Sequence, residues 1–146
     1  MLTNKKLFSE SLPARFDGVF EWDFLDECFA PTKIKPMDLD AIIERKGHFL
    51  VFETKPERAQ NFPVGQGITL KALHNVGCFT IIVLYGKTKE TINKIYVYPE
   101  GAGAEKIKFT NAEKAIKIIT KTWFDFANGK IDNFKNEYAK LLLASE

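Results

Sequence analysis

Apolar and polar positions alternate with a period of two in several short segments of the chain, which is typical of β-strands. Two such segments, residues 40–44 and 49–55, flank the turn 45–48 and predict an antiparallel β-hairpin. The apolar, β-branched run 78–85 predicts a buried central strand, and residues 94–98 alternate as a further strand. The pattern therefore predicts a sheet of at least four strands.

Apolar side chains at helical spacing predict four helices, within residues 15–30, over 65–76, after Asn111 and after Gly129. The helix over 65–76 lies between two strands, so it permits a right-handed crossover that makes those strands parallel. Together the elements predict an α/β fold with a mixed central sheet flanked by helices.

Composition sets limits on the size and partners of the protein. A chain of 146 residues with 45% hydrophobic content predicts one domain, spanning residues 1–146, with a real core. Its net charge of +2 means that attraction to nucleic acid must come from local clusters of charge. Cys28 and Cys78 lack zinc spacing and are expected to be buried free thiols. Without a signal peptide or membrane-length apolar run, a cytoplasmic protein with no membrane contact is expected.

Acidic side chains gather on the predicted hairpin. Strand alternation places Asp38 and Asp40 on one face, and Glu53 and Lys55 share a face of the next strand. Mg²⁺ binds carboxylates together with water and phosphate oxygens, and a neighbouring lysine can stabilise a phosphoryl group. An isolated Glu-x-Lys is more often a solvent-facing strand edge, but here it follows the apolar run 49–52 and precedes Pro56. The context favours a metal site.

The sequence from Pro36 to Lys55 resembles the PD-(D/E)XK nuclease superfamily, in which an aspartate and a following Glu-x-Lys bind Mg²⁺ and cut a phosphodiester bond. The likeness covers roughly residues 36 to 86. It implies a restriction-endonuclease-like core in which Asp40 and Glu53 bind Mg²⁺ or Mn²⁺ and Lys55 acts near the attacking water. Asp38 is a second candidate for the metal aspartate.

Two helices add further candidates through this resemblance. Gln66 or Lys71, from the helix over 65–76, would lie beside the metal, although Gln66 could equally satisfy helix-end amides. A glutamate of the first helix often points to the metal in this superfamily; Glu21 is the candidate, with Asp17 and Glu27 as rivals. In the superfamily, another strand precedes the one that bears the aspartate. Here its only candidate is the short segment 32–35, which is a departure from the superfamily pattern.

The resemblance implies a metal-dependent DNA nuclease of a bacterial or phage-infected cell. No added recognition domain is evident, so a structure-directed, nicking or end-processing enzyme acting on branched or single-stranded DNA is expected. Dimerisation is common in the superfamily, so a homodimer is included in this expectation. Lys114, Lys117 and Lys121 form a basic stripe that would either track phosphates or be a solvated helix face. The alternative function is a catalytically inactive domain of the same fold that binds nucleic acid or a partner protein.

Overall fold

The structure is a computed structural model that describes residues 20–59 and 64–146. The chain divides into two compact units, Met1–Asp40 and Ala41–Glu146. The second unit contains every strand that the structure describes. The expectation of one domain over the whole chain stays a prediction.

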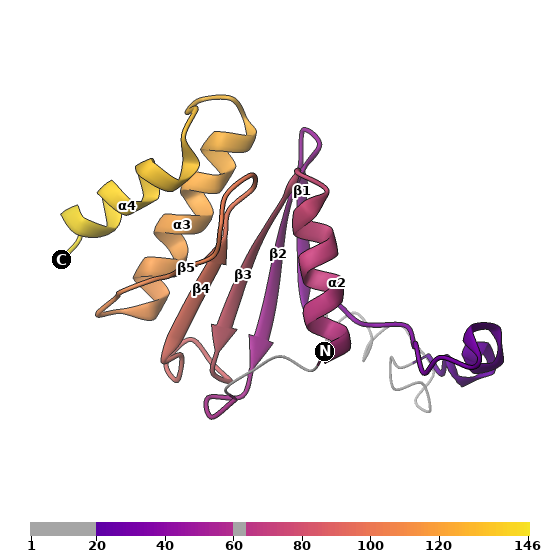
Figure 1. The fold of residues 1–146 in the computed structure, drawn as a ribbon. Coiled ribbons are helices and arrows are strands. Elements are labelled where there is room, and N and C mark those ends of the chain that lie inside the picture. Colours follow the sequence, from indigo (N-terminus) through magenta and orange to yellow (C-terminus); the bar gives the residue numbers. More distant parts are fainter. Residues whose placement is uncertain (1–19, 60–63) are drawn as a thin grey trace, which may run out of the picture. The chain divides into compact units, whose positions relative to one another are not determined.

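Figure 1 shows a mixed α/β arrangement in which helices flank an open sheet. The elements in chain order are the 3₁₀ helix η1 (Asp23–Phe29), β1 (Ala41–Arg45), β2 (His48–Lys55), α2 (Val64–Asn75), β3 (Phe79–Tyr85), β4 (Lys94–Tyr98), β5 (Glu105–Lys106), α3 (Ala112–Ala127) and α4 (Phe134–Ala144). The predicted α/β class and mixed sheet are thereby confirmed.

The five strands lie in sequence order across the sheet, β1-β2-β3-β4-β5. β1 and β2 form the predicted antiparallel hairpin, and its turn residues Lys46 and Gly47 both have positive φ, as a type I′ turn requires. β2 and β3 run parallel and are joined through α2, as expected, whereas β3, β4 and β5 pair antiparallel. The two-residue strand β5 is too short to be recognised from its alternation.

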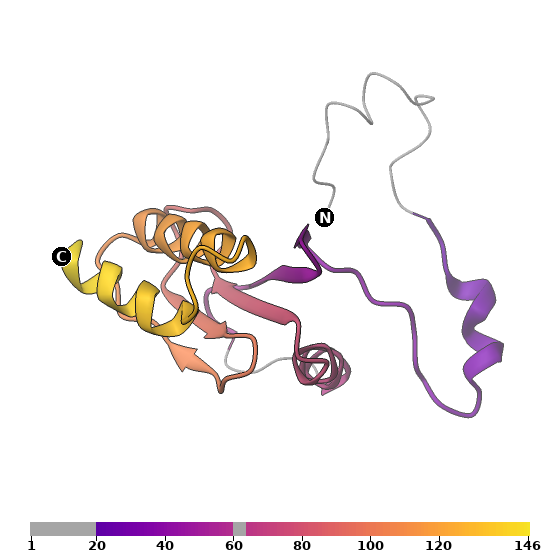
Figure 2. The ribbon, with the colours of Figure 1, turned by 90° about the horizontal axis from the view of Figure 1, so that it is seen from above.

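Helices cover the two faces of the sheet unequally. α3 and α4 pack on one face, where the main apolar core unites strand residues such as Leu50 and Ile82 with Trp123 and Tyr138. α2 lies on the opposite face (Figure 2). In the two described ranges, no helix is long and apolar enough to cross a membrane.

Asparagines begin the two C-terminal helices. The side chain of Asn111 accepts a hydrogen bond from the backbone N–H of Lys114, and Asn133 accepts one from Asn136. Each satisfies an amide that has no partner within its helix. The helix predicted after Asn111 is therefore confirmed, and this asparagine is its N-cap.

The first unit differs from the sequence prediction. Instead of an amphipathic helix over 15–30, its described part has only the 3₁₀ helix η1, and Phe20 and Phe24 are exposed. The prediction fails there because no apolar face is buried, and tertiary burial supplies most of the stability of a natural helix. No strand precedes β1 within residues 20–40. Cys28 is exposed and Cys78 is half-buried, so the expected burial of both thiols is wrong, although both are free.

Tyr138 makes the stability of the core depend on pH. Burial, and secondly a 2.6 Å hydrogen bond to Glu105, raise the pKa of its hydroxyl above the usual value of about 10. The folded chain thus keeps this proton after the unfolded chain has lost it, so the stabilisation is complete below about pH 10 and declines above it.

We expect Tyr138→Phe to lower the free energy of unfolding at neutral pH and to flatten its decline above about pH 10. The removed slope is at most about 1.4 kcal/mol per pH unit. Urea unfolding at a series of pH values, followed by circular dichroism, measures it. Equal slopes in the two proteins would contradict the assignment.

Candidate active site

Strand β2 carries two charged side chains into the interior. Glu53 is 1% exposed and Lys55 is 9% exposed, and both lie on the face of the sheet that α2 covers. The alternation of the strand places Leu50 and Phe52 on the opposite face, in or against the main core. Burial excludes the solvent-facing strand edge that is the common alternative for a Glu-x-Lys pair.

Gln66, near the start of α2, joins these two side chains. Its Nε2 donates to the Glu53 Oε2 over 2.8 Å, and its Oε1 accepts a hydrogen bond from the Lys55 Nζ. A side-chain amide can serve both because it has one donating and one accepting end. The structure therefore brings together three of the predicted site residues, and we call Glu53, Lys55 and Gln66 the polar cluster.

The spacing of side chains along α2 explains why Gln66 faces the sheet. Gln66, Leu70 and His74 are four residues apart and so lie on one side of the helix. Leu70 is 5% exposed and is the one buried side chain among residues 66–75 of this helix. The His74 Nε2 donates to the carbonyl oxygen of Pro99 over 2.8 Å. Three contacts thus fix α2 against the sheet, and Gln66 supplies the first.

The end of β3 fixes the backbone at Lys55. The N–H of Gly86 donates to the carbonyl oxygen of Lys55 over 2.8 Å. A Cβ atom on Gly86 would lie 2.7 Å from the Cα of Ile92, so only glycine allows the β3–β4 loop to approach this closely.

The remaining predicted metal ligands lie in the first unit. Asp40 directly precedes β1, and Asp38 and Glu21 are exposed. Glu21 also precedes η1, so its predicted position on a helix is wrong, and its rival Asp17 lies outside the described residues. The grouping of any of these acids with Glu53 stays a prediction.

The chemistry of the donors limits what metal site could form. Within residues 20–59 and 64–146, no three or more His, Cys, Asp or Glu side chains gather in a way that could hold a metal ion. This donor set does not fit an all-protein cage. The Mg²⁺ or Mn²⁺ ion of the sequence analysis stays a prediction.

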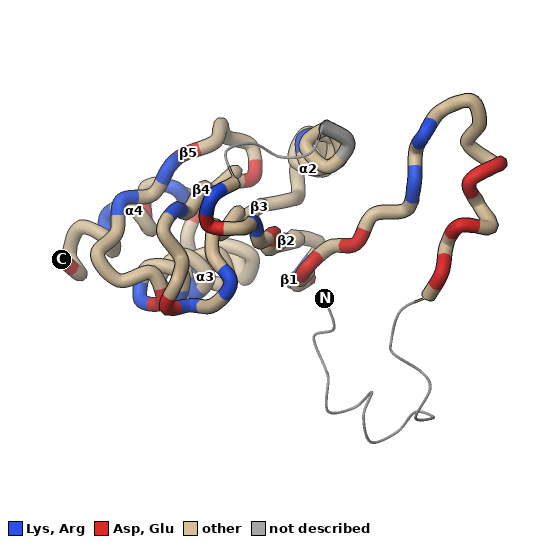
Figure 3. The backbone as a smooth tube through the Cα atoms, turned by 90° about the horizontal axis from the view of Figure 1, so that it is seen from below, with Lys and Arg blue, Asp and Glu red and all other residues tan. Residues whose placement is uncertain are grey.

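The predicted basic stripe is remote from the polar cluster. Lys114, Lys117 and Lys121 belong to α3, which packs on the other face of the sheet. The Lys114 Nζ donates to the carbonyl oxygen of Ser145, and Lys121 pairs with Asp125. Figure 3 shows acidic positions among the basic ones on this helix. These contacts favour the solvated helix face.

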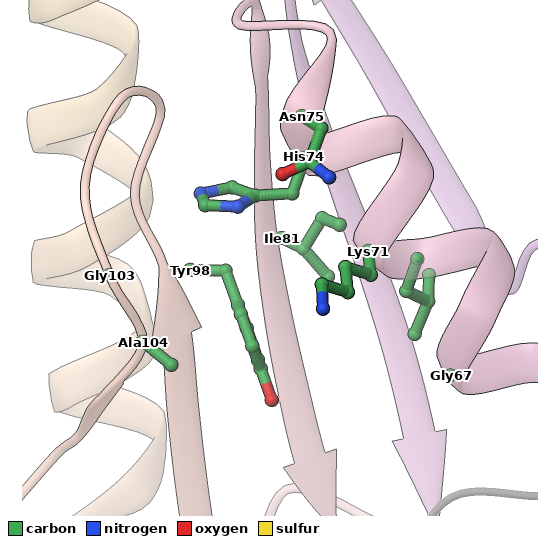
Figure 4. A pocket seen from close by; sticks show the side chains of 9 residues that line it. Gly67, Lys71, His74, Asn75, Ile81, Tyr98, Gly103 and Ala104 are labelled. Carbon is green, nitrogen blue, oxygen red and sulfur yellow. The ribbon is translucent and has the colours of Figure 1, made fainter. Parts of the chain in front are cut away.

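A cavity of about 360 Å³ lies on the same face as the polar cluster, between α2, β3, β4 and the Gly103–Ala104 loop (Figure 4). We call it the α2 groove. Lys71 and Tyr98 point into it from opposite walls, and Gly67, the neighbour of Gln66, lines one end. Tyr98 was not singled out from sequence because aromatic residues in an alternating strand ordinarily fill a core. The available signal was the repeat of tyrosine in Lys94-Ile-Tyr-Val-Tyr98, which places both rings on one face.

Comparisons with protein-family models, curated proteins and solved structures find no match to the chain. The geometry of the site is therefore the basis for a functional assignment.

We expect Gln66→Leu to lower the free energy of unfolding by about 1–3 kcal/mol, because Glu53 and Lys55 each lose a buried hydrogen-bond partner. Denaturant titration followed by circular dichroism measures the change. The control is Lys71→Leu at an exposed position of the same helix, which should change the stability by less than about 0.5 kcal/mol. Equal effects of the two substitutions would contradict the bridging role of Gln66.

Proposed function

We propose that the chain is a metal-dependent DNA nuclease with a restriction-endonuclease-like core, of the PD-(D/E)XK type. The observation that carries this proposal is the polar cluster, in which a buried Glu-x-Lys pair at the end of a strand is joined by a helix glutamine. Charged groups are costly to bury, so natural cores seldom keep them without a task or a well-paired structural role.

Asp40 and Glu53 would hold the Mg²⁺ or Mn²⁺ ion, with Asp38 as the second candidate for the aspartate. Asp40 is preferred because the apolar residues that follow it continue the strand, as they do after the metal aspartate of the superfamily that the sequence resembles. When bound, the ion would polarise the phosphate and lower the pKa of a water molecule.

Lys55 and Gln66 would act on the reacting groups themselves. The Lys55 ammonium would stabilise the negative charge that grows on the phosphoryl oxygens as water attacks phosphorus. The amide of Gln66 already offers one donor and one acceptor in the cluster, and the same ends would orient the attacking water. The bond from phosphorus to the leaving oxygen then breaks, and the water supplies the proton that the leaving group takes. We expect a structure-directed, nicking or end-processing enzyme rather than a site-specific one.

We expect Mg²⁺ to support cleavage of plasmid or branched DNA by the native protein. Glu53→Gln and Lys55→Met should each lower the rate by roughly 100-fold or more, because each removes a charge that acts in the transition state. Gel assays of initial rates measure this. The matched control is Glu90→Gln, which neutralises an exposed carboxylate. Undiminished cleavage by both site variants would exclude the proposed site.

Metal binding can be measured independently of DNA cleavage, by thermal unfolding. We expect Mg²⁺ or Mn²⁺ to raise the thermal midpoint of the native protein, because a ligand that binds only the folded state stabilises it. EDTA should reverse the shift, and Glu53→Gln together with Asp40→Asn should remove it. Shifts of equal size in the variant and the native protein would show that the ion binds elsewhere.

The second candidate is a catalytically inactive domain of the same fold that binds nucleic acid or a partner protein. It is favoured by the 1% exposure of Glu53 together with the lack of a three-residue ligand cluster among the described residues. No cleavage of any DNA substrate, combined with no metal-dependent thermal shift, would support this candidate over the nuclease.

A further inference from the structure

Aromatic side chains line the part of the sheet next to the polar cluster. Directly paired strand residues point to the same face, so the register defines two rows on the α2 side. These rows are Glu53, Val83, Tyr96 and Lys106, and Lys55, Tyr85 and Lys94. Tyr98, at the next same-face position of β4, borders the α2 groove. Tyr85, Tyr96 and Tyr98 therefore occupy neighbouring positions on this face, beginning beside Lys55, and we call them the aromatic surface.

The rings of Tyr85 and Tyr96 contact each other, and the ammonium group of Lys94 lies over the ring of Tyr85. The centroids of Tyr85 and Tyr96 are 6.0 Å apart, and the Lys94 Nζ lies 4.5 Å from the centroid of Tyr85. Tyr96 and Tyr98 are half-buried, and Tyr98 lines the α2 groove. Burial, and secondly the charge of Tyr96, raises the pKa of the Tyr98 phenol.

Charge on this part of the sheet is divided between the two faces. Lys94 of β4 and Lys106 of β5 point to the face of the sheet that α2 covers. Lys71 of α2 lines the groove on the same face. The acids of the same region are held on the other side: Glu100 pairs with His48 over 2.7 Å, and Glu105 accepts the hydrogen bond of Tyr138. The aromatic surface is thus bordered by cations, which complements a phosphate backbone.

We propose that the α2 groove and the adjoining tyrosines bind single-stranded DNA, with bases stacked on Tyr96 and Tyr98 and phosphates near Lys71 and Lys106. The inference rests on the proposed nuclease function and names its substrate class. Bases in a duplex are stacked on each other and offer no free face, whereas unpaired bases can stack on aromatic side chains. A strand bound here would run toward Lys55 and Glu53.

The test is fluorescence anisotropy in EDTA, with labelled oligothymidine as the probe and the same strand in a duplex for comparison. We expect the single strand to bind more tightly than the duplex. Tyr98→Ala should weaken single-strand binding by roughly 5- to 150-fold, the usual effect of losing one stacked base. Tyr98→Phe keeps the ring and should bind within about twofold of the native protein. Circular dichroism confirms that each variant is folded.

Exposed lysines provide a test that does not depend on the core. Lys71→Ala should weaken binding and reduce the slope of log affinity against log salt by about 0.7, the value for one lost phosphate contact on a single strand. Lys117→Ala, on α3, is the matched control and should change neither. Equal effects of these two substitutions, equal binding of single strand and duplex, or identical affinities of Tyr98→Ala and Tyr98→Phe would overturn the proposal. Tighter binding of oligouridine RNA would overturn the assignment to DNA.

Cleavage of the same strand in Mg²⁺ separates this proposal from the nuclease assignment. If Glu53→Gln abolishes cleavage but Tyr98→Ala leaves binding unchanged, the groove is wrong and the nuclease stands. If Tyr98→Ala and Lys71→Ala weaken binding but the native chain cleaves nothing, the nuclease is wrong and single-strand binding stands.

Discussion

The parallel pairing of β2 with β3 is the constraint from which the rest of the structure follows. Parallel neighbours require a crossover, and the chain makes it with α2, a helix of only 12 residues. That helix covers β2 and β3 on one face, which allows β2 to be buried on both sides. It also places Gln66 over Glu53 and Lys55. The same face of β4 remains partly open, and the groove lies between this strand and α2.

Gln66 gives both charged side chains of the polar cluster a hydrogen-bond partner, which offsets part of the cost of their burial. A carboxylate or an ammonium alone in a core would be strongly destabilising, and even a buried pair often stabilises less than apolar residues of similar size. The cluster is therefore weak evidence for stability and better evidence for a task. Its position at the end of an apolar strand, where α/β proteins commonly build sites, agrees with that interpretation.

Local signals explain which parts of the fold could be predicted. The apolar, β-branched run 78–85, the helical spacing after Asn111 and the alternation in 49–55 are each local patterns, and the corresponding elements are confirmed. Glu53 and Lys55 could be placed on one face because strand alternation fixes it, whereas Gln66 was expected beside them only through the resemblance to the PD-(D/E)XK superfamily. The pairing of β4 with β5 and the opening beside Tyr98 depend on how far α2 extends over the sheet, which local patterns do not encode. Over residues 20–30, the described part of the helix expected within 15–30, the prediction failed because amphipathic spacing alone does not ensure that an apolar face is buried.

Helix α2 buries little of its surface against the sheet, and this affects how ligand binding at one of its ends influences binding at the other. Gln66 holds the helix at the polar cluster, while Lys71 and His74 border the groove, and Leu70 alone is buried between them. A short helix is a rigid rod, so a ligand that displaces one end also displaces the other. Affinities at the two ends would then be thermodynamically coupled, and the coupling must be reciprocal. In this chain the single helix α2 would couple ligand binding in the groove to ligand binding at the polar cluster.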